Sequence, residues 1–289
     1  MCHAQLRRGK ASGSSHRRFR LAFVALAAAA LALLLYAWGI EPYWIEVTRH
    51  RVAAAVGPPV TVAHLTDLHL YGLGRRERKL LALLDREKPD LIVITGDSVI
   101  DGELFGPRPE WPDQEAYARA GPFFERLRAP LGVWAVRGNW ENVRRLEDGD
   151  EAAFYAGRGV RLLVDEAAEV RPGLWVAGFD DIQAGPDADA ALRRVPAGAF
   201  VLGLFHSPAW FDTVAGRLPL AVSGHTHGGQ ARPPLVPVFW LPAGSGRYLA
   251  GWYEARGSRM YVSRGVGTST LPVRFRCRPE LALITLGPG

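Results

Sequence analysis

The feature that most constrains the fold is a short apolar run that recurs along the chain, each time followed by a polar residue. Leu91–Thr95 reads LIVIT and is followed by GD, Phe200–Phe205 is followed by His206, and Leu220–Ser223 is followed by GHTHGG. Short apolar runs bounded by turn residues are typical of buried strands. In α/β sheets, ligands bind in the crevice beyond the carboxyl ends of the strands. The recurrence therefore predicts a sheet whose strand ends carry a binding site.

Helical patterns lie between these runs. Arg75–Arg86 places leucines among charged residues, as an amphipathic helix does, and Glu115–Leu127 is predicted to be a second helix. Further strands are predicted at Val60–Thr66, Gly132–Val136, Leu174–Gly178, Tyr248–Glu254, Arg259–Ser263 and Leu281–Leu286. Alternating strands and helices, followed by strands near the end of the chain, indicate an α/β fold with a mixed sheet.

The polar residues at the predicted strand ends have the composition of a metal site. They comprise two carboxylates, four imidazoles and one amide: Asp67, His69, Asp97, Asn139, His206, His225 and His227. Carboxylate with imidazole suits Mn, Fe or Zn, whereas Mg and Ca prefer oxygen ligands alone. Seven ligands are too many for one ion and suit two divalent ions that share a carboxylate. Such a pair can clamp the attacking and leaving oxygens of a phosphoryl displacement.

The spacing of these residues has a physical reason. Asp67 and His69 stand two positions apart, so on an extended strand both side chains would point the same way and reach one ion. His225 and His227 have the same spacing in a glycine-flanked loop, which could turn the two rings toward different ions. Glycines directly before several of the ligands allow tight turns and a close backbone approach.

Several of these stretches resemble a known family. LTDLHL, VITGDSV, VRGNWE, LGLFHSP and SGHTHGGQ, which run through most of residues 60–230, are similar to the motifs of calcineurin-like metallophosphoesterases. The stretch MYVSRGVGTSTLPVRFRCRPELALITL also resembles the membrane-anchored bacterial branch of that family, of YkuE and YaeI type. The resemblance implies a four-layer αββα metallophosphoesterase sandwich, in which helices flank two mixed sheets, and a dinuclear metal site.

The resemblance also implies a role for each ligand. It assigns a first metal ion to Asp67, His69 and His227, a second to Asn139, His206 and His225, and a bridging position to Asp97. It further implies a phosphoric ester hydrolase in which metal-bound hydroxide attacks phosphorus, with Asp97, Asn139 and His206 as the catalytic group. Coordination by two cations lowers the pKa of bound water, which makes hydroxide available near neutral pH.

The loop VRGNWE departs from the family's usual pattern at Trp140, where much of the family has a His that contacts phosphate and can protonate the leaving oxygen. Indole donates a hydrogen bond but supplies no proton near neutral pH. We therefore expect a good leaving group, such as a phosphate or a phenolate, rather than an alkoxide. Glu141 is a candidate substitute acid. Gln230 and Arg264 are further candidates for substrate contact, because Arg offers bidentate geometry for phosphate, with a surface salt bridge as the alternative for Arg264.

The N-terminal region predicts a membrane anchor. Residues 1–20 form a basic tail with six Lys and Arg residues and no acid, and residues 21–40 are an apolar run without charge. A run of about 20 apolar residues spans the bilayer as a helix. Residues 41–58 would then be a juxtamembrane segment and residues 59–289 the phosphoesterase domain.

The basic tail also predicts the topology. It is expected to stay in the cytoplasm and to leave the catalytic domain outside it, in a single-pass protein of the cell inner membrane. A catalytic domain on the cytoplasmic face is the alternative topology. A cleaved signal peptide is the alternative to an anchor.

The net charge of +6 is located in that tail, because the rest of the chain holds 29 basic residues (35 minus six) and 29 acidic ones. A neutral body lacks the broad basic field of nucleic-acid binders. We therefore expect no nucleic-acid partner and a phosphorylated small-molecule or lipid substrate.

The predicted function is a membrane-anchored, dinuclear-metal-dependent phosphoesterase that hydrolyses a phosphodiester or pyrophosphate bond. A UDP-diacylglucosamine-type pyrophosphatase of lipid A synthesis, an activity found in the same superfamily, is the alternative. A non-catalytic metal- or phosphate-binding protein is a second alternative, which Trp140 raises and the full ligand set opposes.

Overall fold

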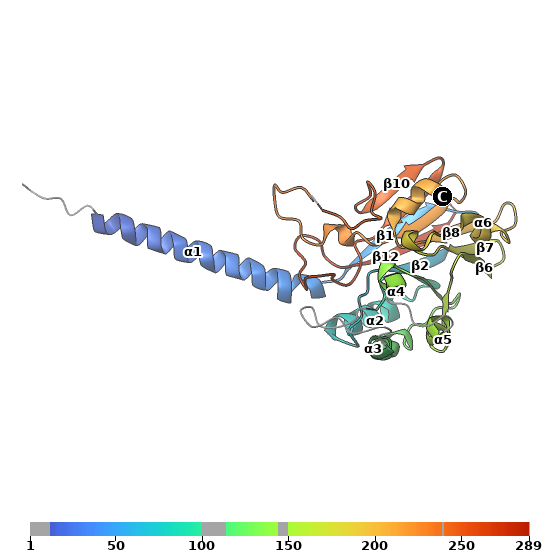
Figure 1. Ribbon diagram of the computed structural model, residues 1–289, viewed down its shortest axis with the longest axis horizontal. Coiled ribbons are helices and arrows are strands. Elements are labelled where there is room, and N and C mark those ends of the chain that lie inside the picture. The colour runs from blue at the N-terminus through green and yellow to red at the C-terminus, as the bar shows by residue number, and fades with distance from the viewer. Residues whose placement is uncertain (1–11, 100–113, 144–149, 239, 289) are drawn as a thin grey trace, which may run out of the picture.

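A long helix projects from a layered body in the computed structural model (Figure 1), which describes residues 12–99, 114–143, 150–238 and 240–288. The first eleven residues of the predicted basic tail lie outside these ranges. The helix is α1 (Ser12–Gly39), whose 28 residues make it about 42 Å long at 1.5 Å per residue. Its large apolar side chains from Phe19 to Leu35 are exposed. By length and composition α1 can cross a membrane, and it fits a single-pass membrane protein.

The strands of the described residues form two sheets. The first sheet contains, in order, β1 (Glu46–Ala53), β12 (Glu280–Gly287), β2 (Val60–Leu65), β3 (Leu91–Thr95), β4 (Val133–Val136) and β5 (Val160–Leu162). The second contains β10 (Gly251–Ala255), β11 (Ser258–Val262), β9 (Leu220–Ser223), β8 (Phe200–Leu204), β7 (Leu174–Gly178) and β6 (Glu166–Arg171). Both sheets are mixed, since β12–β2, β10–β11 and β6–β7 pair antiparallel and the other neighbours pair parallel.

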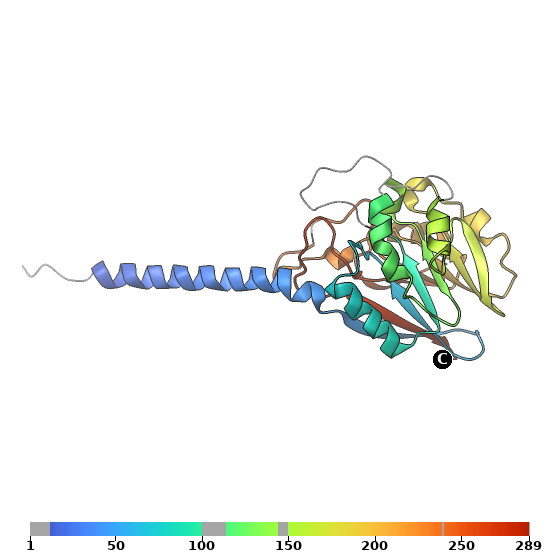
Figure 2. The ribbon, with the colours of Figure 1, turned by 90° about the horizontal axis from the view of Figure 1, so that it is seen from below.

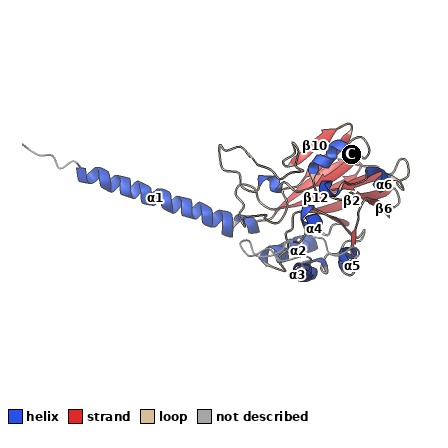
Figure 3. Ribbon diagram, in the orientation of Figure 1, coloured by secondary structure: helices blue, strands red, loops and turns tan. Residues whose placement is uncertain are grey.

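Helices cover the outer face of each sheet (Figures 1 and 3). The first sheet is covered by α2 (Arg75–Glu87), α3 (Gln114–Phe124) and α5 (Asp150–Ala156), and the second by α6 (Ala188–Leu192) and α7 (Phe211–Val214). The remaining short helices are α4 (Asn139–Val143), η1 (Glu41–Tyr43), η2 (Ile182–Ala184), η3 (Pro208–Trp210) and η4 (His227–Gly229).

Three apolar cores separate the layers, and a single strand shows how. Ile92 and Ile94 of β3 pack under the helices of the first sheet, whereas Val93 faces the second sheet. Successive side chains of a strand point to opposite faces, so the continuous run LIVIT fills both cores. A third core holds Val201 of β8 against Phe211 of α7. The four-layer αββα sandwich expected from the sequence is thereby confirmed.

The segment between α1 and the main domain is part of the first sheet. β1 lies within residues 41–58 and pairs in parallel with β12, from Glu46 opposite Glu280 to Ala53 opposite Gly287. The end of α1 is therefore connected to the sheet by only a few residues, and Figure 2 shows α1 leaving the body beside loops of the C-terminal half.

The carboxyl ends of the central strands meet at one edge of the sandwich. β2, β3 and β4 are parallel neighbours in the first sheet, and β8 and β9 are parallel neighbours in the second. His206 follows the end of β8 by two residues. Its side chain reaches the first sheet, where Nδ1 lies 2.8 Å from the carbonyl oxygen of Thr95. Ligands carried by both sheets can therefore meet at this edge.

Candidate metal centre

The structure brings the polar residues of the strand ends into one buried site, in two groups. Asp67, His69 and His227 form one group, and Asp97, His206 and His225 form the other, with the potential ligand atoms of each group within 4.8 Å of one another. All six side chains are buried. Asn139 joins the second group, because its Oδ1 lies 3.1 Å from His206 Nε2.

The ligand atoms have the separations expected around an ion. Metal–nitrogen bonds of about 2.0–2.1 Å place neighbouring ligand atoms about 3 Å apart. In the first group, His69 Nε2 lies 3.1 Å from His227 Nε2, which is 3.3 Å from Asp67 Oδ1. In the second group, His225 Nδ1 lies 2.9 Å from His206 Nε2. The residues present therefore fit two divalent cations.

Asp97 lies between the two groups. Its Oδ2 is 3.8 Å from His69 Nε2 in the first group and 3.2 Å from His206 Nε2 in the second. Its Oδ1 accepts a hydrogen bond from the backbone N–H of Trp140 at 3.0 Å. One carboxylate thus faces both groups while the backbone holds its other oxygen, which is the geometry of a shared ligand.

Backbone carbonyls orient two of the imidazoles. His206 Nδ1 lies 2.8 Å from the carbonyl oxygen of Thr95, and His225 Nε2 lies 2.8 Å from that of Ala243. A carbonyl only accepts, so each of these nitrogens carries a hydrogen, which leaves His206 Nε2 and His225 Nδ1 as the nitrogens that can coordinate an ion. These are the atoms that converge in the second group.

The electrostatics of the site favour bound cations. Burial lowers the pKa of His69 and of His225 to about 4, so both rings are neutral near pH 7 and can coordinate. Burial raises the pKa of Asp67 to about 6. His206 behaves differently: against the effect of burial, the carboxylate of Asp97 raises its pKa to about 10. Without ions a proton on His206 compensates the buried carboxylates, and divalent cations would compensate them more completely.

The backbone at the ligands differs from the prediction. Asp67 and His69 do not share an extended strand; they follow the end of β2 with φ of 50° and 43°. Asp97, His225 and His227 also have positive φ. Such backbone is uncommon for residues other than glycine and clusters at functional sites. The two-residue spacing therefore works through a tight left-handed loop and not through strand alternation.

Two glycines allow the ligand loops to touch. A Cβ on Gly96, which has φ of 80°, would lie 2.6 Å from the Cα of Gly138 and 2.8 Å from His206 Nδ1. No side chain fits at this contact. The glycines before Asp97 and Asn139 therefore allow the loops that follow β3 and β4 to meet.

Glu141 lies behind the site, and the structure corrects the prediction that it contacts substrate or serves as an acid. Its side chain is buried and accepts hydrogen bonds from the backbone N–H groups of Asp97 (2.9 Å), Ser98 (2.6 Å) and Gly138 (2.8 Å). Burial, followed by the charges of Asp97 and Glu151, raises the pKa of Glu141 to about 7. Its oxygens hold together the two loops that carry Asp97 and Asn139.

The structure also gives Arg264 a different place from the predicted substrate contact. The guanidinium lies 3.1 Å from Glu280 and 3.0 Å from Glu46, so the salt bridge that was the alternative is present. Arg264 ties β1 and β12 to the loop after β11. Against the effect of burial, Arg264 lowers the pKa of Glu280 to about 2.

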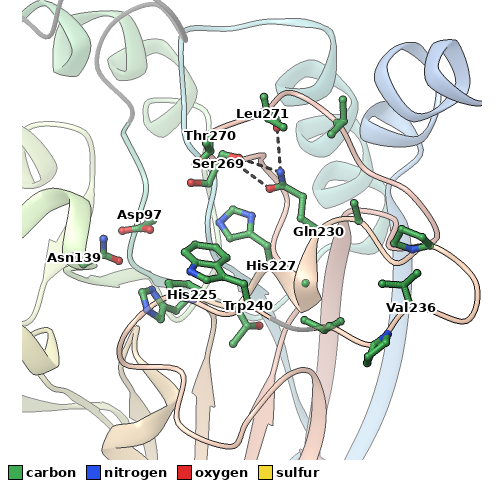
Figure 4. Close-up of a pocket in the computed structure, with 18 of the residues that line it drawn as sticks. Asp97, Asn139, His225, His227, Gln230, Val236, Trp240, Ser269, Thr270 and Leu271 are labelled. Atoms are coloured by element: carbon green, nitrogen blue, oxygen red, sulfur yellow. Dashed lines mark hydrogen bonds between the residues drawn. The ribbon is translucent and has the colours of Figure 1, made fainter.

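Gln230 lines a cavity beside the metal ligands, but its side-chain amide is hydrogen-bonded to the protein's own backbone. Nε2 donates to the carbonyl oxygens of Ser269 and Leu271, each at 3.0 Å, and Oε1 accepts from Ser269 N–H at 2.9 Å (Figure 4). Gln230 therefore fixes the loop at residues 269–271 against η4.

Trp140 lies at the boundary between the ligands and the pocket. Its ring packs edge to face against His69, with centroids 5.8 Å apart, and it also lines the cavity. The position that would carry a His in much of the family thus presents an indole beside the first ligand group.

A cavity of about 580 Å³ opens from the ligands, and its apolar wall was not predicted from the sequence. Asp97, Asn139, His225 and His227 lie at one end, whereas prolines, valines, Trp240 and Leu271 form much of the rest. The sequence signal that could have indicated this wall is the stretch PPLVPVFWLP. It is strongly apolar but too rich in proline to form a central strand.

The fold and the site together define a class: a two-sheet α/β sandwich with adjacent ligand groups for two divalent ions at the ends of its strands. The family model for calcineurin-like phosphoesterases matches residues 60–229. The chain belongs to this family and is a metal-dependent phosphoester hydrolase.

Relatives support the same assignment over most of the chain. The metallophosphoesterase YkuE of Bacillus subtilis strain 168 is 31% identical over 284 residues, which cover 91% of this chain and 94% of YkuE. The phosphodiesterase YaeI of Escherichia coli K12 is 30% identical over 85% of this chain and 90% of its own length. A protein of Bos taurus named transmembrane protein with metallophosphoesterase domain is 27% identical over 97% of this chain and 66% of its own length.

Proposed function

We propose that the chain is a membrane-anchored phosphoesterase that uses two divalent metal ions to hydrolyse a phosphodiester or pyrophosphate bond of a lipid-linked or small-molecule substrate. The observation that carries the proposal is the position of Asp97, whose Oδ2 faces both ligand groups at the inner end of the cavity. An arrangement of this kind suits attack on phosphorus, because two adjacent ions can address both the entering and the leaving oxygen.

In this proposal the ligands keep the roles expected from the family. Each group holds one ion, the first with Asp67, His69 and His227 and the second with Asn139, His206 and His225, and Asp97 is shared. When bound, the ions would supply an activated water and neutralise charge on the phosphoryl oxygens. The carbonyls of Thr95 and Ala243 hold His206 and His225 in the coordinating tautomer.

The residues around Asp97 restrict the leaving group. The backbone N–H of Trp140 donates a hydrogen bond to Asp97 Oδ1. The indole side chain of Trp140 occupies the position at which much of the family has a His that can protonate a basic alkoxide. Glu141 cannot replace that donor, because it is buried behind the loop and its oxygens accept backbone N–H groups. A phosphate leaving group of a pyrophosphate, or a phenolate, needs little protonation and therefore suits the site. The same argument fits a UDP-diacylglucosamine-type pyrophosphatase, the second candidate, which goes with the alternative topology in which the catalytic domain lies on the cytoplasmic face.

We further propose that α1 anchors the protein and that the catalytic domain lies on the extracytoplasmic side. The charge asymmetry supports this topology, because all six basic residues of positions 1–20 precede the apolar run. A phosphatase reporter fused to the C-terminus should be active, and a cytoplasmic reporter at the same position inactive. The opposite pair of results would place the domain in the cytoplasm.

The activity is tested with the full-length chain in nonionic detergent, loaded with Mn²⁺ and measured with bis(p-nitrophenyl) phosphate and p-nitrophenyl phosphate. We expect metal-dependent turnover that is lost on chelation and restored by Mn²⁺. Protein that holds two ions per chain and turns over neither ester would contradict the proposal.

A further inference from the structure

The apolar part of the cavity is formed by two loops that expose large hydrophobic side chains. Val236 and Trp240, from the loop after η4, are 46% and 69% exposed, and Leu271, from the facing loop, is 50% exposed. The cavity falls within the range of roughly 300–1,000 Å³ that is usual for small-ligand sites. Its apolar wall shares one cavity with the metal ligands, and Thr226, Gln230, Ser269 and Thr270 also line that cavity.

Hydrogen bonds fix the wall in place. The amide of Gln230 binds both sides of the loop at Ser269 and Leu271. Arg232 N–H donates to the carbonyl oxygen of Phe275 at 2.8 Å, and Phe275 N–H donates to that of Gln230 at 3.1 Å. The two loops are thus joined to each other. The Gln230 amide, which could otherwise bind a polar ligand, is engaged in hydrogen bonds to the facing loop.

The same wall is attached to the end of α1. Arg274 N–H donates to the carbonyl oxygen of Ala37 at 2.9 Å, and the rings of Tyr36 and Phe275 pack edge to face with centroids 6.4 Å apart. Exposed Trp38 and Trp44 follow in the chain. Aromatic side chains of this kind favour the membrane interface. In Figure 4, Val236 and Leu271 lie on the side of the cavity away from Asp97 and Asn139.

We propose that this apolar cavity binds the hydrocarbon chain of a membrane lipid phosphoester with a weakly basic leaving group, such as the phosphate of a pyrophosphate, and that the reacting phosphorus lies at the metal centre. The inference rests on the proposed phosphoesterase activity and adds the substrate class. The hydrocarbon chain of the lipid enters from the bilayer surface, because the cavity wall is attached to the last turn of α1. The hydrocarbon lies along Val236, Trp240 and Leu271, and the ester oxygens face Asp97 and Asn139.

The test uses a series of p-nitrophenyl alkyl phosphates with methyl, butyl and octyl groups, so that the leaving group is constant. The full-length, Mn²⁺-loaded chain is assayed below the micelle concentration of each ester. We expect kcat/KM to rise with chain length, by up to about fourfold per methylene. A p-nitrophenyl ester of uridine monophosphate is the comparison for a soluble nucleotide.

Variants separate the cavity wall from the exposed surface. Val236→Glu and Leu271→Glu place charge in the wall and should lower the ratio of octyl to methyl kcat/KM by about tenfold or more. Leu235→Glu is the matched control, since Leu235 is fully exposed next to Val236 and does not line the cavity. It should keep the wild-type ratio.

The outcomes distinguish the inference from the function on which it rests. A flat chain-length series with good turnover of the methyl ester, or a preference for the uridine ester over the octyl ester, would overturn the lipid assignment and leave the phosphoesterase standing. An equal loss of ratio in all three variants would also overturn it. No metal-dependent turnover of any ester would overturn both.

Discussion

Glu141→Gln is the substitution that tests most sharply how the two metal-binding loops are held together. The Glu141 carboxylate accepts N–H groups from Asp97, Ser98 and Gly138. An amide has one acceptor oxygen, so at least one of these buried N–H groups would lose its partner and face the amide N–H. At pH 8, above the pKa of about 7, the wild-type side chain is ionised and accepts all three.

The magnitude follows from the lost hydrogen bond. One buried unsatisfied donor costs about 1–3 kcal/mol, so we expect the free energy of unfolding to fall by about 2 kcal/mol. Loss of a group that orients metal ligands typically weakens metal binding by about 10- to 100-fold. The effect on metal affinity should exceed the effect on overall structure, because the loops involved carry Asp97 and Asn139.

The assay combines urea unfolding of the metal-free chain with metal competition against a chromophoric chelator, both at pH 8. Glu115→Gln is the control, because Glu115 is an exposed carboxylate on α3 that pairs with Arg119 on the surface. A Glu141→Gln protein with the metal affinity and unfolding midpoint of Glu115→Gln would refute the reasoning.

Three further predictions follow from the same structure. Asp97→Asn should reduce bound metal below two ions per chain and turnover by more than about a hundredfold, as measured by metal analysis and the diester assay; survival of both would remove the bridging role. Trp140→His should raise turnover of alkyl phosphate esters more than that of p-nitrophenyl esters, and equal effects would contradict the leaving-group argument. Glu280→Gln should cost up to about 3 kcal/mol of stability at pH 7, since the pKa of Glu280 is lowered from 4.5 to about 2. That contribution is present above pH 4.5 and is lost as the pH falls to 2, so wild type and variant should converge in acid unfolding; a difference independent of pH would exclude the charge of Glu280 as its cause.

The strands that carry the ligands could be predicted because their sequences are continuous apolar runs. The observed bounds of Leu174–Gly178 and Leu220–Ser223 coincide with those expected. β5 and β6 escaped prediction, since VRL is short and EAAEVR carries charges, and their pairing partners are what make them strands. The sequence therefore predicted the central strands and the ligands at their ends more reliably than it predicted the strands at the edges of the sheets.

Backbone conformation and contacts distant in sequence could not be predicted. The positive φ of Asp67 and His69 is a property of the loop after β2, and no alternation in the sequence encodes it. The role of Glu141 depends on the meeting of two loops more than 40 residues apart, at Asp97 and at Gly138. The apolar cavity depends on the docking of one loop on another near α1.

The central claim is that the site holds two ions that share Asp97. Its most direct test is metal analysis combined with electron paramagnetic resonance of the Mn²⁺-loaded chain. The structure predicts two Mn²⁺ per chain and the exchange-coupled spectrum of ions about 3.5–4 Å apart. One ion per chain, or two ions with uncoupled six-line spectra, would contradict it.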